Sequence, residues 1–445
     1  MKSIKLGAGA GYSGDRIDPA VVLAQQAKLD YLVFECLAER TMALAQQSLD
    51  AKRNEGYDPL LAERMTAVLS ECHHREIRII SNMGAANPRA AARKTAEIAR
   101  SLGLHGVRIA AITGDDVLPW IISHPADFIL QDGRPINSVL ERTISANAYL
   151  GALPVLEALN GGADVVLTGR VADPSLFVGP MMFEYGWSED DWHKLGQATL
   201  IGHLLECAGQ LTGGYFADPG YKDVPDLANL GFPYAEVAED GSSIFRKVVG
   251  TGGMLNRATC MEQLLYEIQD PSSYFTPDVI ADFTQVTIEE IGPDQVSVRG
   301  GRGRERPRSL KVSVGFRDGY VGEGQISYGG PGALSRAELA ISVLEERLRQ
   351  IGLEETRFDL IGLNSLHGKH LSRFAPEPYE VRVRAVGRAS TLAGANYVVR
   401  EVEALYTNGP AGGGGVATSA RETITLASTS IPSDCITTAI DYEVS

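Results

Sequence analysis

The sequence predicts an α/β protein whose mostly parallel, Rossmann-like sheet carries helices on both faces, followed by a second mixed α/β domain. In the first half, short apolar runs alternate with helical patterns, which is typical of a parallel sheet. In the second half the apolar runs resemble shorter, antiparallel strands. A polar connection over 223–229 separates the two regions, so we expect domains at 1–228 and 229–445.

Length and composition restrict the class of protein. A chain of 445 residues, 44% hydrophobic and 22% charged, is long enough for two globular domains. A net charge of −15 argues against a nucleic-acid partner. The N-terminus lacks a signal-peptide pattern and no apolar run is long enough to span a membrane, so we expect a soluble, cytoplasmic protein. Five scattered cysteines without a C-x-x-C pair indicate neither disulfides nor a zinc ribbon.

The strands of the first domain are expected to direct their following loops to one edge of the sheet. We expect these strands at 4–6, 30–35, 76–82, 106–111 and 163–168. We expect helices at 89–102 and 146–159, and another that begins at Asp18-Pro19. Each strand is followed by a polar or glycine-rich loop, and ligands bind outside the carboxyl ends of parallel strands. The side chains expected to converge there are Asp15, Glu35, Asn82, Asp115 and Asp173.

The second domain is expected to mix short strands with three helices. The expected strands are 235–238, 243–249, 279–290, 295–299, 310–316, 320–327, 358–364, 380–386 and 422–427. The expected helices are 256–268, 335–351 and 392–405. The helix at 335–351 is amphipathic, because Ala337, Ile341, Leu344 and Leu348 form one apolar stripe.

The glycine-rich stretch Gly7–Gly14 joins the first strand to the first helix. Glycine tolerates tight turns and close approaches, and backbone N–H groups at a helix start hold anions, so this loop is a candidate ligand site. The alternative is a simple turn. The letters of a dinucleotide-binding G-x-G-x-x-G motif are also present, but Asp18-Pro19 starts the helix too late for that motif. We therefore expect no cofactor.

Carboxylates are the leading candidates for chemistry. Asp15, Glu35 and Asp173 are expected to act in proton transfer, which requires positioned groups of tuned pKa. Arg16 and Arg170 are expected to clamp an anionic group of the substrate. Two alternatives stay open: Asp173 is also suited to cap a helix, and Glu35 to pair with Arg40.

Other chemistries have weaker signals in the sequence. Cys36 stands between a strand and a helix, where a helix dipole lowers a thiol pKa, although most free cysteines are small buried hydrophobes. His367 and His370 lack a carboxylate at ligand spacing, so we expect no metal. The expected substrate-binding residues are Gly9, Gly11, Tyr12, Ser13, Gly14, Arg16, Cys36, Asn82, Gly84, Asn87, Asp115, Gly169, Arg170, Ser175, Gly214 and Gly252.

Several long motifs resemble the AtuA-like family, which is named for acyclic terpene utilisation. The matching stretches cover nearly the whole chain and are 9–19, 29–41, 82–88, 162–173, 209–220 and 250–253. The resemblance implies a place among enzymes that degrade branched terpenoid acids as acyl-CoA thioesters. Many members also carry a small C-terminal ferredoxin-like domain of about a hundred residues, a common domain size. This chain shows no such segment after the matching region, so the resemblance implies a separate small ferredoxin-like subunit.

Together these features predict a catabolic enzyme that acts on a small organic acid or an acyl-CoA thioester. Cofactor-free acid–base chemistry of the lyase or hydratase type fits the carboxylates best. A non-catalytic ligand-binding or scaffolding subunit is the main alternative, and a nucleotide-dependent ligase or dehydrogenase is a third. We also expect a homo-oligomer.

Overall fold

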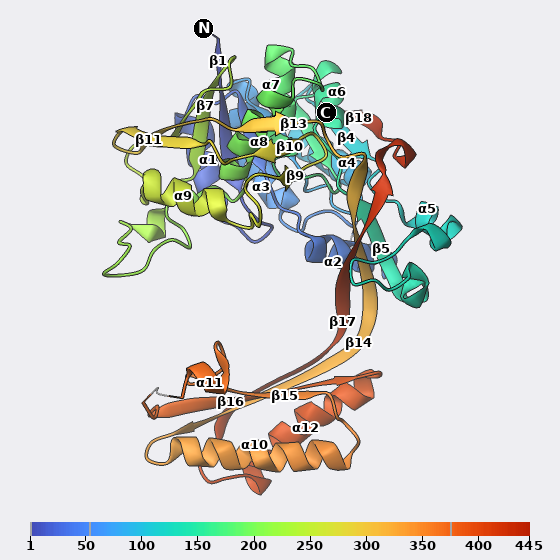
Figure 1. Ribbon diagram of the computed structural model, residues 1–445, viewed down its shortest axis with the longest axis vertical. Coiled ribbons are helices and arrows are strands. Elements are labelled where there is room, and N and C mark those ends of the chain that lie inside the picture. Colours follow the sequence, from blue (N-terminus) through green and yellow to red (C-terminus); the bar gives the residue numbers. More distant parts are fainter. Residues whose placement is uncertain (1, 53–54, 374–375) are drawn as a thin grey trace. The chain divides into compact units, whose positions relative to one another are not determined.

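A computed structural model describes residues 2–52, 55–373 and 376–445 (Figure 1). The chain divides into two compact units. Unit 1 comprises Met1–Gly315 together with Leu426–Ser445, and unit 2 comprises Phe316–Thr425. The predicted α/β class is confirmed. Among the described residues, no helix has the length and apolar character needed to cross a membrane.

Unit 1 is built on a ten-stranded sheet with a parallel centre. The central strands, in spatial order, are β1 (Ser3–Ala10), β2 (Tyr31–Phe34), β3 (Arg78–Ser81), β6 (Val165–Thr168) and β4 (Arg108–Thr113). Every residue of β2 and of β6 is buried, as expected for parallel strands covered on both faces. The continuous apolar runs in the sequence reflect this burial.

Antiparallel strands extend both edges of this parallel centre. Beyond β1 lie β7 (Pro233–Ala238), β8 (Ser243–Lys247), β12 (Gln295–Arg299) and β11 (Thr287–Gly292), and beyond β4 lies β18 (Ala439–Val444). The expected boundary at 228/229 falls inside unit 1, because β7 pairs with β1 and β7, β8, β12 and β11 continue the first sheet. The contacts place the division at 315/316 instead.

Two groups of helices cover the sheet. One group packs together and consists of α1 (Asp18–Gln26), α3 (Leu61–His74) and α4 (Pro88–Ser101). The other consists of α6 (Leu153–Asn160), α7 (Ser175–Tyr185) and α8 (Trp192–Glu206). Residues 195–206 of α8 are all buried, which fits a helix enclosed by the sheet and by later segments. The expected helix at 146–159 is wrong in its first part, because residues 143–148 form β5 (Thr143–Ala148) and pair with β14.

Short elements complete unit 1. They are α2 (Glu39–Asp50), α5 (Leu118–Ser123), α9 (Arg257–Leu265), β9 (Tyr274–Phe275), β10 (Ile280–Asp282) and β13 (Arg302–Arg304). The last three form a small sheet in the order β13-β10-β9, and α8 packs against β10 and β13. The strand expected at 279–290 is therefore two strands, β10 and β11, in different sheets.

Unit 2 has the βαββαβ order of a ferredoxin-like fold. Its elements are β14 (Ser309–Gly329), α10 (Ala333–Gln350), β15 (Thr356–Ile361), β16 (Glu380–Ala389), α12 (Leu392–Asn408) and β17 (Gly414–Pro432), with the short helix α11 (Gly368–Leu371) before β16. The strand order β15-β16-β14-β17 places the third strand beside the first, as in that fold. The two strands expected at 310–316 and 320–327 are thus one long strand, β14. This chain therefore contains a ferredoxin-like unit of its own, whereas the sequence analysis expected such a unit only as a separate subunit.

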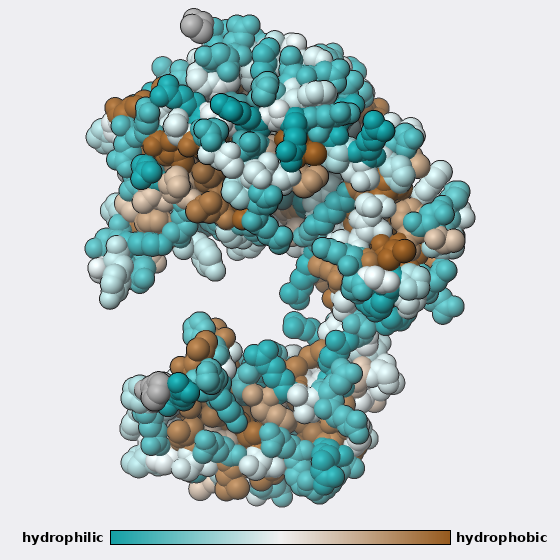
Figure 2. Space-filling view, viewed as in Figure 1, coloured by the Kyte–Doolittle hydropathy of each residue, from teal (hydrophilic) through white to brown (hydrophobic). Residues whose placement is uncertain are grey.

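The core of unit 2 lies between its sheet and its two helices. Ala337, Leu344 and Leu348 of α10 are buried together with Val398 and Val402 of α12. This confirms the amphipathic stripe of the sequence. On the face seen in Figure 2, hydrophobic residues form several small groups among hydrophilic ones.

We expect Leu344→Ala to lower the free energy of unfolding of the chain by about 2–5 kcal/mol, because the change leaves a cavity in this core. Leu339→Ala on the same helix is the matched control. The Leu339 side chain is 54% exposed, so its truncation should change stability by about 0.5 kcal/mol or less. Urea unfolding monitored by circular dichroism measures both effects, and equal losses in the two variants would contradict the described packing.

Candidate active site

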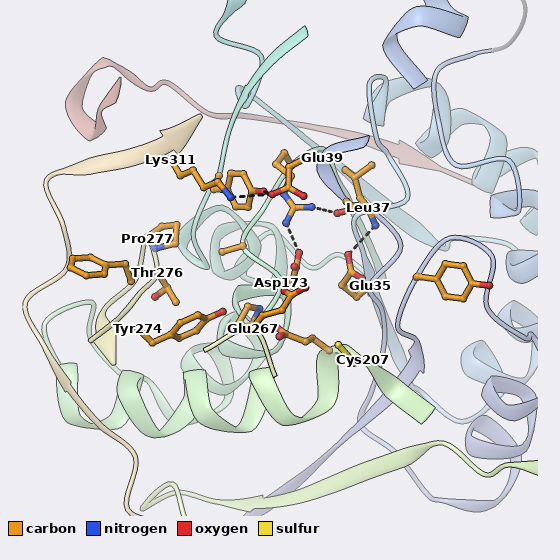
Figure 3. A pocket seen from close by; sticks show the side chains of 18 of the residues that line it. Glu35, Leu37, Glu39, Asp173, Cys207, Glu267, Tyr274, Thr276, Pro277 and Lys311 are labelled. Carbon is orange, nitrogen blue, oxygen red and sulfur yellow. Dashed lines mark hydrogen bonds and ion pairs between the residues drawn. The ribbon is translucent and has the colours of Figure 1, made fainter. Parts of the chain in front are cut away.

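A cavity of about 590 Å³ lies at the carboxyl ends of β1, β2 and β6 (Figure 3). Three strand-end loops form one part of its wall. They contribute residues 11–13 after β1, 35–39 after β2 and 170–174 after β6. The start of α2, Tyr149 after β5, the ends of α8 and α9, the segment around β9 and the start of β14 form the rest. The cavity therefore combines the predicted sheet edge with segments distant in sequence.

Glu35, the first residue after β2, is held with its carboxyl group in a fixed position. Its Oε1 accepts hydrogen bonds from the backbone N–H of Leu37 and from Nδ2 of Asn82, both at 2.9 Å. Asn82 follows the neighbouring strand β3, and its Oδ1 accepts from the N–H of Cys36 at 2.7 Å. Burial and the nearby Asp173 raise the pKa of Glu35 to about 8, although Arg170 acts in the opposite direction. Glu35 is therefore protonated at neutral pH.

Arg170 and Asp173 form an ion pair in the loop after β6. Nη2 of Arg170 lies 2.7 Å from Oδ1 of Asp173, and Nη1 donates to the carbonyl of Leu37. Burial alone would lower the pKa of Arg170, but the surrounding acidic groups, Asp173 first, raise it. Burial raises the pKa of Asp173, and Arg170 opposes this shift. The Asp173 side chain is 35% exposed, whereas the Arg170 side chain is almost fully enclosed.

A second ion pair, between Glu39 and Lys311, lies beside Tyr149. The Tyr149 hydroxyl donates to Glu39, and Nζ of Lys311 lies 3.0 Å from the same Glu39 oxygen. Burial would raise the pKa of Glu39, but the Tyr149 hydroxyl and the nearby cations lower it to about 2. The guanidinium of Arg170 lies 4.2 Å from the Tyr149 ring centroid and Lys311 Nζ lies 4.8 Å from it. Arg170 and Lys311, the cationic residues of the described lining, are thus both engaged by carboxylates.

Asp115 positions the backbone that carries Arg170. Its Oδ2 accepts from the N–H of Arg170 at 2.8 Å and from Nδ2 of Asn147 at 2.9 Å. A Cβ atom at Gly169 would come within 2.5 Å of the Asp115 carboxylate, so glycine is needed for this close approach. Asp115 lies outside the cavity lining and acts on the site through Arg170.

The glycine-rich loop after β1 is held by Arg64, a residue that the sequence analysis did not identify. Arg64 of α3 is fully buried, and its Nη2 donates to the carbonyl of Ser13 at 2.7 Å and more weakly to those of Tyr12 and Asp15. The feature of the sequence that could have identified Arg64 is its position among the apolar residues that form the buried face of α3. The buried arginine satisfies carbonyl groups of the turn and so fixes the part of the loop that lines the cavity.

The comparisons with known proteins identify the family. The profile described as "Acyclic terpene utilisation family protein AtuA" matches residues 4–442. The chain belongs to this family. No curated protein and no solved structure matches it. Membership of the family gives the chain a catabolic role in acyclic terpene utilisation.

In this AtuA family protein, seven of the predicted site residues line one cavity. They are Gly11, Tyr12, Ser13, Glu35, Cys36, Arg170 and Asp173. Gly11 is packed so closely on the backbone of Cys207 that a Cβ atom would lie 2.5 Å from it. Burial raises the pKa of the Cys36 thiol well above its usual value, so a thiolate nucleophile at this position is disfavoured.

The remaining predicted residues lie outside the cavity lining. They are Gly9, Gly14, Asp15, Arg16, Asn82, Gly84, Asn87, Asp115, Gly169, Ser175, Gly214 and Gly252. Oδ2 of Asp15 accepts from the N–H of Gly11, and Arg16 donates to the carbonyl of Ala228, so this pair stabilises loops. Asn87 caps α4, and the Ser175 hydroxyl donates to Asp278. Arg16 is therefore not in position to clamp an anion in the cavity.

The sequence analysis missed Glu39, at the start of α2 after β2, and the cavity residues that come from later elements. The latter include Tyr149, Glu206, Glu267, Tyr274 and Lys311. Their position depends on how these later segments pack on the sheet edge, which no local pattern encodes. Among the described residues, no group of three or more His, Cys, Asp or Glu side chains could hold a metal ion.

The raised pKa of Glu35 predicts how stability depends on pH. Glu35 has a pKa of about 8 in the folded chain and about 4.3 in the unfolded chain, so between these values the folded chain binds more protons. Its contribution to stability is complete below the unfolded pKa and is lost as the pH rises. We expect this group to lower the free energy of unfolding by about 1.4 kcal/mol per pH unit in that interval.

Urea unfolding at a series of pH values tests this expectation. Glu35→Gln should remove this component of the slope. Glu39→Gln is the control, because Glu39 has a pKa of about 2 and does not titrate in that interval. Identical slopes for wild type and Glu35→Gln would show that Glu35 is not held protonated.

Proposed function

We propose that the cavity catalyses cofactor-free proton transfer on a small acyl substrate, in a lyase or hydratase reaction. The observation that carries the proposal is a pair of carboxyl groups with different surroundings in one cavity. Glu35 is buried without an ion-pair partner, whereas Asp173 is bonded to Arg170. Such a difference separates the pKa values of two carboxyl groups and assigns one the role of acid and the other that of base.

The roles follow from these surroundings. In a hydration, Asp173 would take a proton from water while the water oxygen forms a bond to one alkene carbon. The electron pair of the double bond would take the proton of Glu35 at the other carbon. Dehydration is the reverse, and exchange with solvent would restore both protonation states. Arg170 stabilises the ionised Asp173 and is a positioning residue.

The lining favours a thioester over a free acid. Leu37, Ala172, Phe275, Pro277 and Leu310 give the cavity an apolar part that suits a branched hydrocarbon chain. Arg170 and Lys311 are already paired with carboxylates, so a substrate carboxylate among Glu35, Asp173 and Glu39 would lack a cation. An acyl-CoA thioester is uncharged at its reactive end and carries its phosphates at a distance from it.

We expect Glu35→Gln and Asp173→Asn each to lower turnover by about 10²-fold or more, the typical contribution of general acid–base catalysis. A panel of saturated, α,β-unsaturated and 3-hydroxyacyl-CoA thioesters, followed by mass spectrometry of the products, provides the assay. Glu63→Gln, at an exposed position of α3, should retain wild-type turnover. Asp15→Asn should have a smaller effect, because Asp15 acts through the backbone of the loop.

Unchanged turnover in Glu35→Gln and Asp173→Asn would overturn the assignment of these carboxylates. If the wild-type protein binds members of the panel and converts none of them, the chain is instead a non-catalytic ligand-binding subunit.

We also propose a separate small ferredoxin-like subunit and a homo-oligomeric assembly in the cytoplasm. The family resemblance supports the partner, while the ferredoxin-like topology of unit 2 gives this chain one such unit of its own. Native mass spectrometry of the protein purified from its natural host should show more than one copy of this chain together with a small second chain. Recovery of this chain alone, as a monomer, would contradict both parts.

A further inference from the structure

Tyr274 of β9 lines the cavity and has no part in the proposed roles of Glu35 and Asp173. Its ring packs on two buried aromatic side chains. The ring centroid lies 5.5 Å from that of His203 and 5.6 Å from that of Phe283. These neighbours are 1% and 4% exposed, so they belong to the interior. The ring of Tyr274 is therefore held by the core, while its hydroxyl group is left to the cavity.

The hydroxyl group of Tyr274 faces the acidic side chains of the site. Figure 3 shows the oxygen end of the ring directed toward Asp173 and Glu267. The side chain is half-buried, and its hydroxyl makes no hydrogen bond to any described residue. This oxygen is also absent from the polar atoms that the described residues enclose completely. A molecule in the cavity can therefore reach it.

This hydroxyl is a hydrogen-bond donor at neutral pH. Burial first, and then the nearby Glu206 and Asp173, raise the pKa of Tyr274 well above its usual value, so the phenol keeps its proton. The cations of the described lining, Arg170 and Lys311, are already bonded to carboxylates. A carbonyl oxygen of a ligand only accepts hydrogen bonds, and Tyr274 offers it a donor that no described residue occupies.

We propose that the Tyr274 hydroxyl donates a hydrogen bond to the carbonyl oxygen of a bound acyl thioester. This inference rests on the proposed function and deepens it, because it names the group that holds the carbonyl. As water adds to the alkene carbon farther from the carbonyl, the electron pair of the double bond shifts toward the carbonyl oxygen. The nearer carbon then takes the proton of Glu35, and Tyr274 keeps its own proton throughout. A donor aimed at this oxygen stabilises the charge that develops there.

Infrared spectroscopy of a bound thioester tests this contact. The probes are saturated and α,β-unsaturated acyl thioesters of N-acetylcysteamine, in graded chain lengths and with an isotopically labelled carbonyl group. A hydrogen bond to the carbonyl oxygen weakens the C=O bond and lowers its stretching frequency. For at least one probe, we expect a lower carbonyl frequency when it is bound to the wild-type protein than when it is bound to Tyr274→Phe.

Tyr274→Phe removes one oxygen atom and keeps the ring that packs on His203 and Phe283. Isothermal titration calorimetry should show that the variant binds the same probe about fivefold more weakly, the usual effect of losing one hydrogen bond. Its affinity for the corresponding thioether, which lacks the carbonyl, should equal that of the wild-type protein. Tyr221→Phe is the matched control, because Tyr221 is 88% exposed and lies outside the cavity lining. It should retain the wild-type frequency and affinities.

A second comparison needs no variant. The wild-type protein should bind the thioester probe about fivefold more tightly than the thioether, because only the thioester accepts the hydrogen bond. If the wild-type protein also converts the unsaturated probe, Tyr274→Phe should lower turnover by about 10²-fold or more, the typical effect of removing one donor to a developing oxyanion.

Each outcome decides the inference. Equal carbonyl frequencies in the wild-type protein and Tyr274→Phe overturn it, as does a wild-type protein that binds no probe or binds thioether and thioester equally. If turnover depends on Glu35 and Asp173 while Tyr274→Phe leaves the carbonyl frequency unchanged, the proposed function stands and this inference fails. A frequency shift lost in Tyr274→Phe and kept in Tyr221→Phe supports it, even if the wild-type protein converts no probe; in that case the carbonyl contact stands and the proposed catalysis fails.

Discussion

The burial of one guanidinium group, that of Arg170, organises the candidate site. A buried cation is stable only when its charge is compensated, and here Asp173, the carbonyl of Leu37 and the face of the Tyr149 ring surround it. These contacts join the loop after β6 to the loop after β2. The buried Asp115 accepts a hydrogen bond from the Arg170 backbone, and Gly169 provides the space for that contact. The relative positions of Glu35 and Asp173 therefore depend on this arginine.

Arg64 plays the corresponding part for the glycine-rich loop. It lies in the core, where its Nη1 forms an ion pair with Asp58, while its Nη2 donates to the carbonyl groups of Tyr12, Ser13 and Asp15. Two buried arginines thus fix three strand-end loops of the sheet. Both guanidinium groups are buried, so neither is exposed to an anionic ligand. The cavity lining also carries carboxyl groups, of which Glu35 and Glu206 have pKa values raised chiefly by burial.

The loops expected at the edge of the sheet meet at one cavity, whereas the directions of several individual side chains differ from the expectation. Glu35, Cys36, Arg170 and Asp173 line the cavity, as expected from their position directly after strands. Asp15 and Arg16 stand equally close to a strand end, but the turn directs both toward backbone groups. Sequence position identifies the loop, whereas the direction of a side chain depends on the turn conformation and on the groups packed around it.

The sequence by itself determined the α/β class, the parallel central strands, the amphipathic stripe of α10 and the edge at which the loops meet. These features follow from local periodicity and from the burial of continuous apolar runs. Tertiary structure alone decided that β7, β8, β12 and β11 continue the first sheet, since the pairing of β7 with β1 joins segments far apart in the chain. It also decided that Glu206, Tyr149 and Lys311 complete the cavity, because contacts between distant elements depend on packing that no short stretch of sequence specifies.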